Sequence, residues 1–446
     1  MYGVSGAGGL VNIISKRPKD DAYNELKLTF GTDSRKELAF DFTGPVGTDG
    51  RLSYRLTGVA RDADTPLPGY SDDLALLAPS FTYQLTDRTK ITVLTEYSES
   101  TRGGTASYYN PSQGEASDIY VGDPDYNDFV NEQWRVGYEL EHEMDNGVTL
   151  RQNLRYSEVD ADLEFSGIYA AGTGFGRYWG HYLENSENFS VDTYAEGHFS
   201  TGAFDHTVVA GFDYTQSSYD AYYGGVGYVS AADTDAVDQP YSNGQEMYQY
   251  GVYVHDQLSS GPWTMFLSGR YDWVDMTTFD ANQNGTDTSH NGFSGRVGLS
   301  YAFNTDLSVY ANVSSSFVPT TGLVYDDSTD PNSGRSAEPT RGLQKEVGVK
   351  YQLPGTESLI TASLFDIRQE DGVVFQTVDP ATFNGLNQVQ VPYDLRSRGL
   401  EIEGQFNFAN GLRVTSAYTY LDMEIEAGST GTVGNQLSAT PHHTAS

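Results

Sequence analysis

Hydrophobic and polar residues alternate along almost the whole chain. In the segment NELKLTF (24–30), Leu26, Leu28 and Phe30 point to one side of an extended backbone, and the residues between them point to the other side. About 17 such segments lie between residues 24 and 422, and most are longer than the five or six residues typical of strands in soluble proteins. The pattern recurs in KELAFDF, RLSYRLTG, KITVLTEY, QWRVGYELEHE, VTLRQNLRY, WTMFLSGRYDWV, FSGRVGLSYAF, KEVGVKYQL, RGLEIEGQFNF and LRVTSAYTYL. We therefore predict an all-β protein.

The connections between these segments alternate in length. The short ones are the turn sequences at 47–50, 86–89, 145–147, 200–203, 260–262, 304–306, 354–357 and 409–411. After a short first connection near 32–35, the long ones are predicted at 63–74, 100–133, 160–186, 218–248, 275–292, 318–344 and 370–395. Strict alternation of this kind is typical of an outer-membrane barrel, which has short periplasmic turns at one rim and long external loops at the other.

The composition of the two strand faces supports a membrane barrel. One face carries mainly Leu, Val, Phe, Tyr and Trp, and Tyr97, Trp134, Tyr156 and Trp273 near strand ends predict a lipid-facing aromatic girdle. A mean hydropathy of -0.48 fits a barrel, because only alternate residues contact lipid. A soluble β-propeller is the alternative, but it requires a repeat of about 40 residues, which the sequence lacks.

The ends of the chain suggest that it is a piece of a longer protein. A count of about 17 strands is odd, whereas bacterial single-chain barrels close with even numbers. The last residues, NQLSATPHHTAS, begin where another strand is due. No signal peptide opens the chain, so we expect either a cytoplasmic protein or a missing N-terminal part.

The chain opens with four glycines within seven positions, in MYGVSGAGGLVNIISKRP. A phosphate-binding loop requires a strand before such glycines and a helix after them. No strand precedes them here, and the β-branched Val11, Ile13 and Ile14 favour a strand after them. We therefore do not expect a nucleotide site.

Composition also excludes several functions. A net charge of -35 would repel nucleic-acid phosphates and anionic membrane surfaces. The chain has no cysteine, which excludes thiol chemistry, and His442 and His443 lack the spacing of metal ligands. No nucleophile elbow is present. We expect neither an enzyme nor a resident cofactor or metal.

Residues 280–291 begin like a calcium-binding loop. Asp280, Asn282, Asn284 and Gly285 have the required spacing, but the twelfth position is Asn291 where such loops carry glutamate. An acidic turn is therefore the preferred interpretation.

Several motifs together resemble TonB-dependent ferric-siderophore receptors. The opening YGVSGAGGLVNIISKRP resembles the end of that family's plug domain. The segments SSSFVPTTG (314–322), EPTRGLQKEVGVKYQL (338–353), SRGLEIEGQF (397–406) and TPHHTAS (440–446) resemble its barrel segments in the same order. The resemblance implies that residues 19–446 are an incomplete barrel, which has about 22 strands in the intact family. It also implies that residues 1–18 end the plug, with the motif residues Tyr2, Gly3, Gly6, Gly8, Gly9 and Asn12.

The resemblance gives the opening glycines a structural role. Within a narrow lumen they would let the backbone turn tightly and pass close to the barrel wall. Lys16, Arg17 and Pro18 would then end the plug strand and direct the chain into the wall, because proline cannot donate to a ladder.

The predicted long loops are rich in aromatic residues, which suit capture of a bulky amphipathic ligand. In the resembled family, loop aromatics bind the ferric chelate, and packing or girdle roles are the alternative for each residue. The candidates are Tyr108, Tyr109, Tyr169, Tyr178, Trp179, Tyr222, Tyr223 and Tyr228, with the pairs Tyr178-Trp179 and Tyr222-Tyr223 preferred. Carboxylates in the predicted loops would repel a polyanionic ferric catecholate and tolerate a neutral or cationic hydroxamate. These carboxylates are Asp118, Asp123, Asp125, Asp128, Asp233, Asp235 and Asp238.

The resemblance implies an outer-membrane receptor of a Gram-negative bacterium, surrounded by outer-membrane lipid. It would bind a ferric siderophore and import it with energy from a TonB-type protein, which acts through a segment missing from this chain. The alternatives are a receptor of the same architecture for vitamin B12 or an oligosaccharide, and a passive porin or adhesin without energy coupling.

Overall fold

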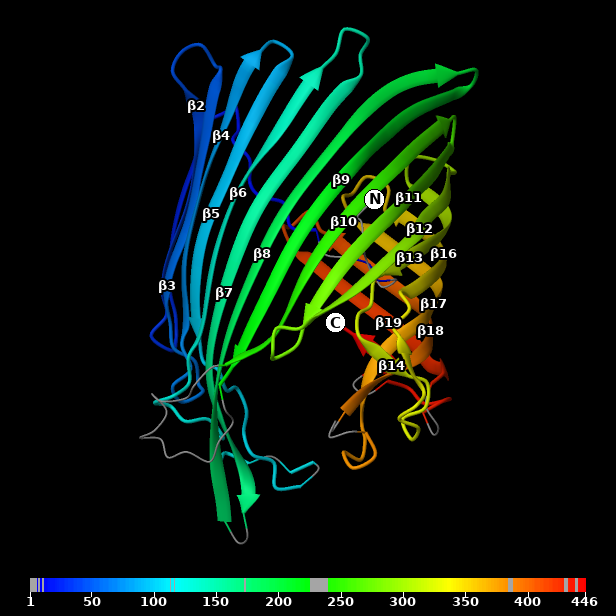
Figure 1. The fold of residues 1–446 in the computed structure, drawn as a ribbon. Coiled ribbons are helices and arrows are strands. Elements are labelled where there is room, and N and C mark those ends of the chain that lie inside the picture. The colour runs from blue at the N-terminus through cyan, green and yellow to red at the C-terminus, as the bar shows by residue number, and fades with distance from the viewer. Residues whose placement is uncertain are drawn as a thin grey trace.

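The computed structural model describes residues 6, 9, 12–112, 114–115, 117–171, 174–224, 240–383, 388–428, 432–437 and 440–446. These residues form one curved sheet of 20 strands (Figure 1). Three strands have only three residues, which leaves the 17 long strands that the alternation predicted. The strands are β1 Tyr23–Phe30, β2 Lys36–Val46, β3 Leu52–Asp62, β4 Asp72–Thr86, β5 Thr89–Arg102, β6 Phe129–Glu143, β7 Thr149–Ala171, β8 Gly174–Thr201, β9 Phe204–Tyr223, β10 Tyr241–Ser260, β11 Trp263–Phe279, β12 Gly285–Ala302, β13 Leu307–Val318, β14 Leu323–Tyr325, β15 Gly334–Ser336, β16 Thr340–Gln352, β17 Leu359–Thr377, β18 Gln388–Asn407, β19 Arg413–Ala427 and β20 His443–Ala445.

Long strands pair antiparallel with their neighbours in the chain, and β13 pairs with β16 because β14 and β15 belong to the connection between them. The eight predicted tight turns all lie between directly paired strands and are confirmed. They gather at the upper rim in Figure 1, and the long connections gather at the lower rim. We call the lower rim the loop rim.

Four predicted long loops were too wide, including 370–395, where β17 runs to Thr377 and β18 starts at Gln388. Strands β7 and β8 remain paired up to Ala171 and Gly174, so most of 160–186 is a ladder. Likewise, β9 runs to Tyr223 and β10 starts at Tyr241, and only 280–284 separates β11 from β12. Beyond the lipid, both faces of a strand can be polar, so the hydrophobic alternation fades while the backbone hydrogen bonds continue.

Contacts of the N-terminal segment identify the inner face of the sheet. Lys16 pairs with Asp41 on β2, and Arg17 pairs with Glu139 on β6. One short segment can reach both strands only from the concave side. Trp134 is five residues from Glu139 and therefore faces outward, as required of a girdle residue.

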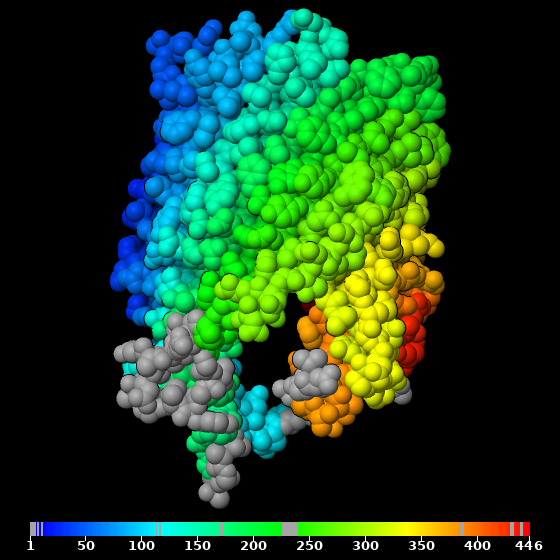
Figure 2. Space-filling view, in the orientation of Figure 1, coloured from blue at the N-terminus to red at the C-terminus, as the bar shows by residue number. Residues whose placement is uncertain are grey.

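The aromatic residues predicted to form a girdle lie on the outer face. Tyr97 lies opposite Trp134 in the β5–β6 ladder, and the rings of Trp134 and Tyr156 are 5.1 Å apart. Tyr97, Trp134 and Trp273 are all substantially exposed, although they lie in well-paired strands. Figure 2 shows the outer wall as a continuous surface of side chains from the blue strands to the yellow-green ones.

The two edges of the sheet are β1 and β20. Among the described residues, β1 pairs only with β2 and β20 only with β19, so the sheet is curved without being closed. His443–Ala445 pairs with β19 as the short strand β20. Within the described part of the chain, no helix is long and apolar enough to cross a membrane.

Candidate ligand-binding site

The segment before β1 is held on the inner wall by ion pairs. The Lys16 Nζ donates to the Asp41 carboxylate at 2.8 Å, and Arg55 donates to the same carboxylate through Nε and Nη2 at 2.8 and 2.7 Å. Arg17 binds both carboxylate oxygens of Glu139 at 2.6 Å. These contacts place residues 16–19 inside the curve of the sheet.

The close approach predicted for the opening glycines is wrong at the two glycines that the structure describes. A Cβ atom added at Gly6 or Gly9 would meet nothing within 4 Å, so neither position requires glycine for a close approach to the wall. Gly9 does adopt a φ of +98°, so the expectation of a tight turn is confirmed there. Tyr2, Gly3 and Gly8 lie outside the described residues, and Asn12 lies on the described segment before the wall contact.

Deeper along the inner wall, a buried arginine binds two aspartates. Arg270 donates to Asp272 at 2.6 and 2.9 Å and to Asp213 at 2.8 Å. Gln249 also donates to Asp272 at 2.8 Å, and neither Arg270 nor Asp272 is exposed by more than 2%. This network cross-links three neighbouring strands, β9, β10 and β11.

The β7–β8 hairpin extends past the rest of the sheet at the loop rim (Figure 1). Its pairing runs without a register shift from Thr149 to Ala171, so the inner face can be followed outward residue by residue. Asn153 of β7 lies opposite both Glu139 and Asp192, which places Asp192 of β8 on the inner face. Residues an even number of positions from Asp192 share that face.

An aromatic stripe lies on this inner face, between the level of the girdle and the tip of the hairpin at the loop rim. The ring of Phe165 is 4.9 Å from that of Tyr182, and the ring of Tyr182 is 4.5 Å from that of Tyr223. Tyr178 contacts Phe165 edge-on at 6.4 Å and covers Gly167, where no side chain would fit. All four rings are partly exposed, so the stripe presents apolar surface toward the mouth of the sheet. We call Phe165, Tyr178, Tyr182 and Tyr223 the inner aromatic stripe.

A carboxylate borders the stripe. Glu184 of β8 accepts hydrogen bonds from the phenols of Tyr219 at 2.9 Å and Tyr223 at 3.1 Å. Tyr219 lies four residues before Tyr223 on β9 and therefore faces the same way. The site thus combines aromatic rings with one negative charge.

The opposite face of the same hairpin is covered by the connection between β5 and β6. The Trp179 indole Nε1 donates to Asp123 at 3.1 Å, and Trp179 is only 6% exposed. Ser166 exchanges hydrogen bonds with Thr105, and Arg177 donates to the Val121 carbonyl. In this structure Trp179 therefore packs against a loop and does not face the mouth of the sheet.

The other predicted aromatics are dispersed. Tyr169 lies over Gly176 on the inner face, farther out than the stripe, and Tyr222 faces outward against Tyr241. Tyr108 and Tyr109 lie on the β5–β6 connection, where they contact Tyr120 and Phe175 respectively. Tyr228 and the carboxylates Asp233, Asp235 and Asp238 lie outside the described residues.

The two preferred pairs of candidates are each split by the strand. Tyr178 and Trp179 are adjacent on β8, and Tyr222 and Tyr223 are adjacent on β9, so the two members of each pair face opposite sides. Phe165, Tyr182, Tyr219 and Glu184 were not selected from the sequence. Extending the two-residue period through 160–186 would have grouped Tyr182 and Glu184 with Tyr178, because all three lie at even positions of β8.

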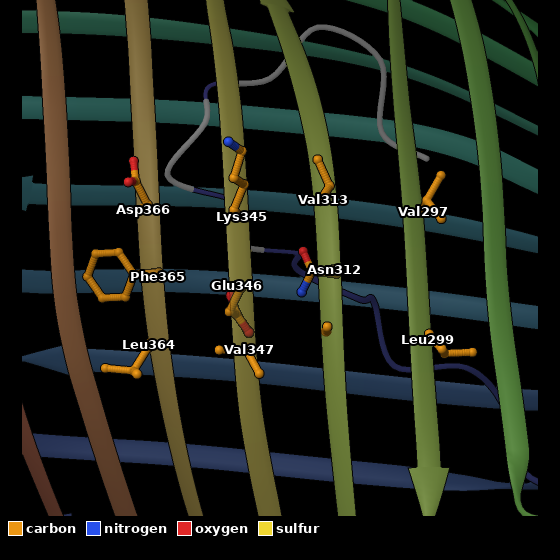
Figure 3. Close-up of a pocket in the computed structure, with 11 residues that line it drawn as sticks. Val297, Leu299, Asn312, Val313, Lys345, Glu346, Val347, Leu364, Phe365 and Asp366 are labelled. Atoms are coloured by element: carbon orange, nitrogen blue, oxygen red, sulfur yellow. The ribbon is translucent and has the colours of Figure 1, made fainter.

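The groove in Figure 3 lies on the outer wall. Val297, Val313 and Leu364 line it and are about half exposed, on the face that also carries the girdle. The groove has a volume of about 540 Å³ and passes over Ala311, whose small side chain leaves the hollow. This apolar groove faces lipid, so it is not part of the inner site.

The segment that begins like a calcium-binding loop forms a turn of only five residues, 280–284. Asp280 Oδ1 accepts hydrogen bonds from the backbone N–H groups of Asn282 and Asn284 at 2.9 Å, and β12 has already begun at Gly285. In the part of the chain that the structure describes, no group of three or more acidic or histidine side chains is arranged to hold a metal ion.

We expect this turn to be sensitive to acid. The Asn284 side-chain amide donates to Asp280 and lowers the pKa of that carboxyl below its ordinary value of 3.8. A lowered pKa means that the carboxylate stabilises the turn above pH 4 and that this contribution disappears as the pH falls through the lowered value. A titration of the Asp280 carboxyl by NMR should therefore have its midpoint below that of a peptide of the same sequence. Asn284→Ala should move the midpoint back up, and equal midpoints in protein and peptide would contradict the prediction.

Comparisons with known proteins agree on one kind of molecule. The family described as TonB dependent receptor-like, beta-barrel matches residues 77–446. A ferrioxamine B receptor of Salmonella typhimurium is 31% identical over 469 residues, which cover 100% of this chain and 64% of the relative. The ferrichrome outer membrane transporter/phage receptor of Escherichia coli is 30% identical over 497 residues, with the same coverage of 100% and 64%. The chain thus spans less than two thirds of the length of these curated relatives.

Solved structures show the same fold. The ferripyoverdine receptor of Pseudomonas aeruginosa bound to ferripyoverdine aligns with a TM-score of 0.80 and 18% identity, over 96% of this chain and 59% of the receptor. The ferric preacinetobactin receptor of Acinetobacter baumannii aligns with a TM-score of 0.79 and 20% identity, over 97% and 66%. At this identity the likeness concerns the fold alone.

Proposed function

Because this chain belongs to the TonB-dependent receptor-like β-barrel family, we propose that it forms most of the barrel of a receptor that binds a ferric siderophore and imports it into the periplasm. Proteins of this family lie in the outer membrane of Gram-negative bacteria and are transporters, not enzymes. Iron is cargo in this proposal and is carried by the chelate.

The observation that carries the proposal is the position of the inner aromatic stripe. It lies at the loop rim, on the same face as the lumen wall, and partly exposed rings there can hold a chelate that arrives from outside. The ferrioxamine and ferrichrome relatives, at 31% and 30% identity, favour a hydroxamate-type chelate.

In the proposed receptor, a plug domain fills the barrel and an external protein supplies the energy for transport. Residues 1–18 are the end of a plug domain, and the ion pairs of Lys16 and Arg17 hold that end on the wall. A TonB-type protein supplies the energy through a segment outside these residues. The plug can move only if its contacts differ between the chelate-bound and the empty receptor, and no covalent step is involved.

The proposal is tested by iron uptake in cells with and without the protein. Radioactive iron is offered as ferric trihydroxamate, ferric tricatecholate and ferric citrate, with and without an uncoupler of the proton-motive force. We expect uptake that depends on the protein, favours the trihydroxamate and stops with the uncoupler.

Two other outcomes would overturn the proposal. Uptake that continues with the uncoupler would indicate a passive porin. Absence of uptake with every chelate, together with growth defects on cobalamin or an oligosaccharide, would indicate a receptor for another nutrient.

A further inference from the structure

The Glu184 carboxylate is held in place on one side only. Both phenols that donate to it, those of Tyr219 and Tyr223, bind the same oxygen, Oε1. Among the described residues, Oε2 receives no hydrogen bond, and no basic side chain lies within the 4 Å of an ion pair. Glu184 therefore keeps an acceptor, Oε2, that can serve a molecule at the mouth of the sheet.

The aromatic rings beside this carboxylate add to its preference for a cation. Tyr182 lies between Phe165 and Tyr223 at 4.9 and 4.5 Å, and Tyr223 donates to Glu184. The faces of aromatic rings attract ammonium groups, and a carboxylate next to them adds a charge-assisted hydrogen bond. Rings and a carboxylate on one face are thus suited to bind a positively charged group.

The arginine of β8 is directed elsewhere. Arg177 lies on the opposite face, where it donates to the Val121 carbonyl and to Ser166. Farther down the inner face of β8, Asp192 accepts a hydrogen bond from Tyr253, so a second carboxylate follows Glu184 toward the lumen. An ammonium group that reaches Glu184 from the loop rim therefore does not meet Arg177, and Arg155 of β7 lies on the inner face beside Asp192, farther from the loop rim than Glu184.

We propose that Glu184, positioned by Tyr219 and Tyr223 beside the inner aromatic stripe, binds an ammonium group on the ferric chelate and makes the receptor prefer chelates that carry one. This inference rests on the proposed function and deepens it. It assigns charge selection to one carboxylate and leaves the bulk of the chelate to the rings.

Two chelates that differ only in charge test the inference. One is a linear ferric trihydroxamate that ends in a primary amine, and the other is the same chelate with that amine acetylated. Binding of each to the full receptor is measured at pH 7 by quenching of intrinsic fluorescence. We expect the amine form to bind about tenfold more tightly, as one charge-assisted hydrogen bond with its cation–π contacts allows.

Three variants locate the selectivity. Glu184→Gln should reduce the preference to less than about twofold while binding of the acetylated chelate is retained, which also shows that the variant is folded. Tyr223→Phe removes one of the two donors that fix the carboxylate, and it should lower the preference by about threefold. Glu187→Gln, three residues away on the outward face of β8, should leave the preference unchanged.

The outcomes separate this inference from the proposed function. Equal binding of both chelates by the native receptor, or a preference that survives in Glu184→Gln, would overturn the role of Glu184 while the receptor for ferric chelates stands. Failure of the native receptor to bind these or any other ferric chelates would overturn both.

Discussion

Replacing Arg270 with methionine should lower the free energy of unfolding by about 3–5 kcal/mol. The guanidinium binds Asp213 and Asp272, and Asp272 is only 1% exposed. Methionine fills similar space but leaves both carboxylates without their cation. An unpaired buried charge is strongly destabilising, because burial removes its water without replacing the lost interactions.

The measurement is the urea-induced unfolding of the protein from lipid vesicles, followed by tryptophan fluorescence. Arg88→Met is the matched control, since Arg88 pairs with Asp145 at an exposed turn, and it should cost less than about 1 kcal/mol. Adding Asp213→Asn and Asp272→Asn to Arg270→Met should recover part of the loss. A cost for Arg270→Met no larger than that of the control would show that the network does not stabilise the sheet.

Replacing Gly104 with alanine should detach the β5–β6 connection from the β7–β8 hairpin, at a cost of about 1–3 kcal/mol. An added Cβ would lie 2.0 Å from the carbonyl oxygen of Glu164, which is backbone within β7 and cannot move aside. The connection would have to lift, breaking the hydrogen bonds of Thr105 with Ser166 and of Asp123 with Trp179.

Limited proteolysis measures this detachment, because a lifted connection is open to cleavage between 103 and 128. We expect cleavage of Gly104→Ala at protease concentrations that leave the native protein intact. Gly197→Ala is the control, since the atom nearest to its added Cβ lies 3.9 Å away. Equal cleavage of both variants would contradict the prediction.

Much of the fold could be predicted from the sequence because strands and tight turns carry local signals. Alternation defines a strand where lipid contacts one face, and the turns at 47–50 and 145–147 contain glycines with a φ of +80° at Gly47 and Gly147. The extent of β7 and β8 beyond the lipid could not be predicted in this way. Their pairing there depends on backbone hydrogen bonds and on the packing of a connection whose Thr105 contacts Ser166 from 61 residues earlier in the chain.

The candidate site could be predicted only in part. Aromatic residues at 178 and 223 were selected for their chemistry, and both belong to the inner aromatic stripe. Whether a given ring faces the mouth or a covering loop depends on the side of the strand that it occupies, which is why Trp179 and Tyr178 differ. The contact between Trp179 and Asp123 joins residues 56 positions apart, and no local pattern indicates it.

The unbroken ladder of the β7–β8 hairpin has a consequence for how such a receptor can evolve. Successive side chains of the hairpin face two separate surfaces. A mutation at Tyr178 or Tyr182 therefore alters the surface at the mouth of the sheet, while Arg177 and Trp179 continue to hold the connection in place. Selection for a new nutrient can therefore change the side chains at the mouth without weakening the contacts that hold the connection.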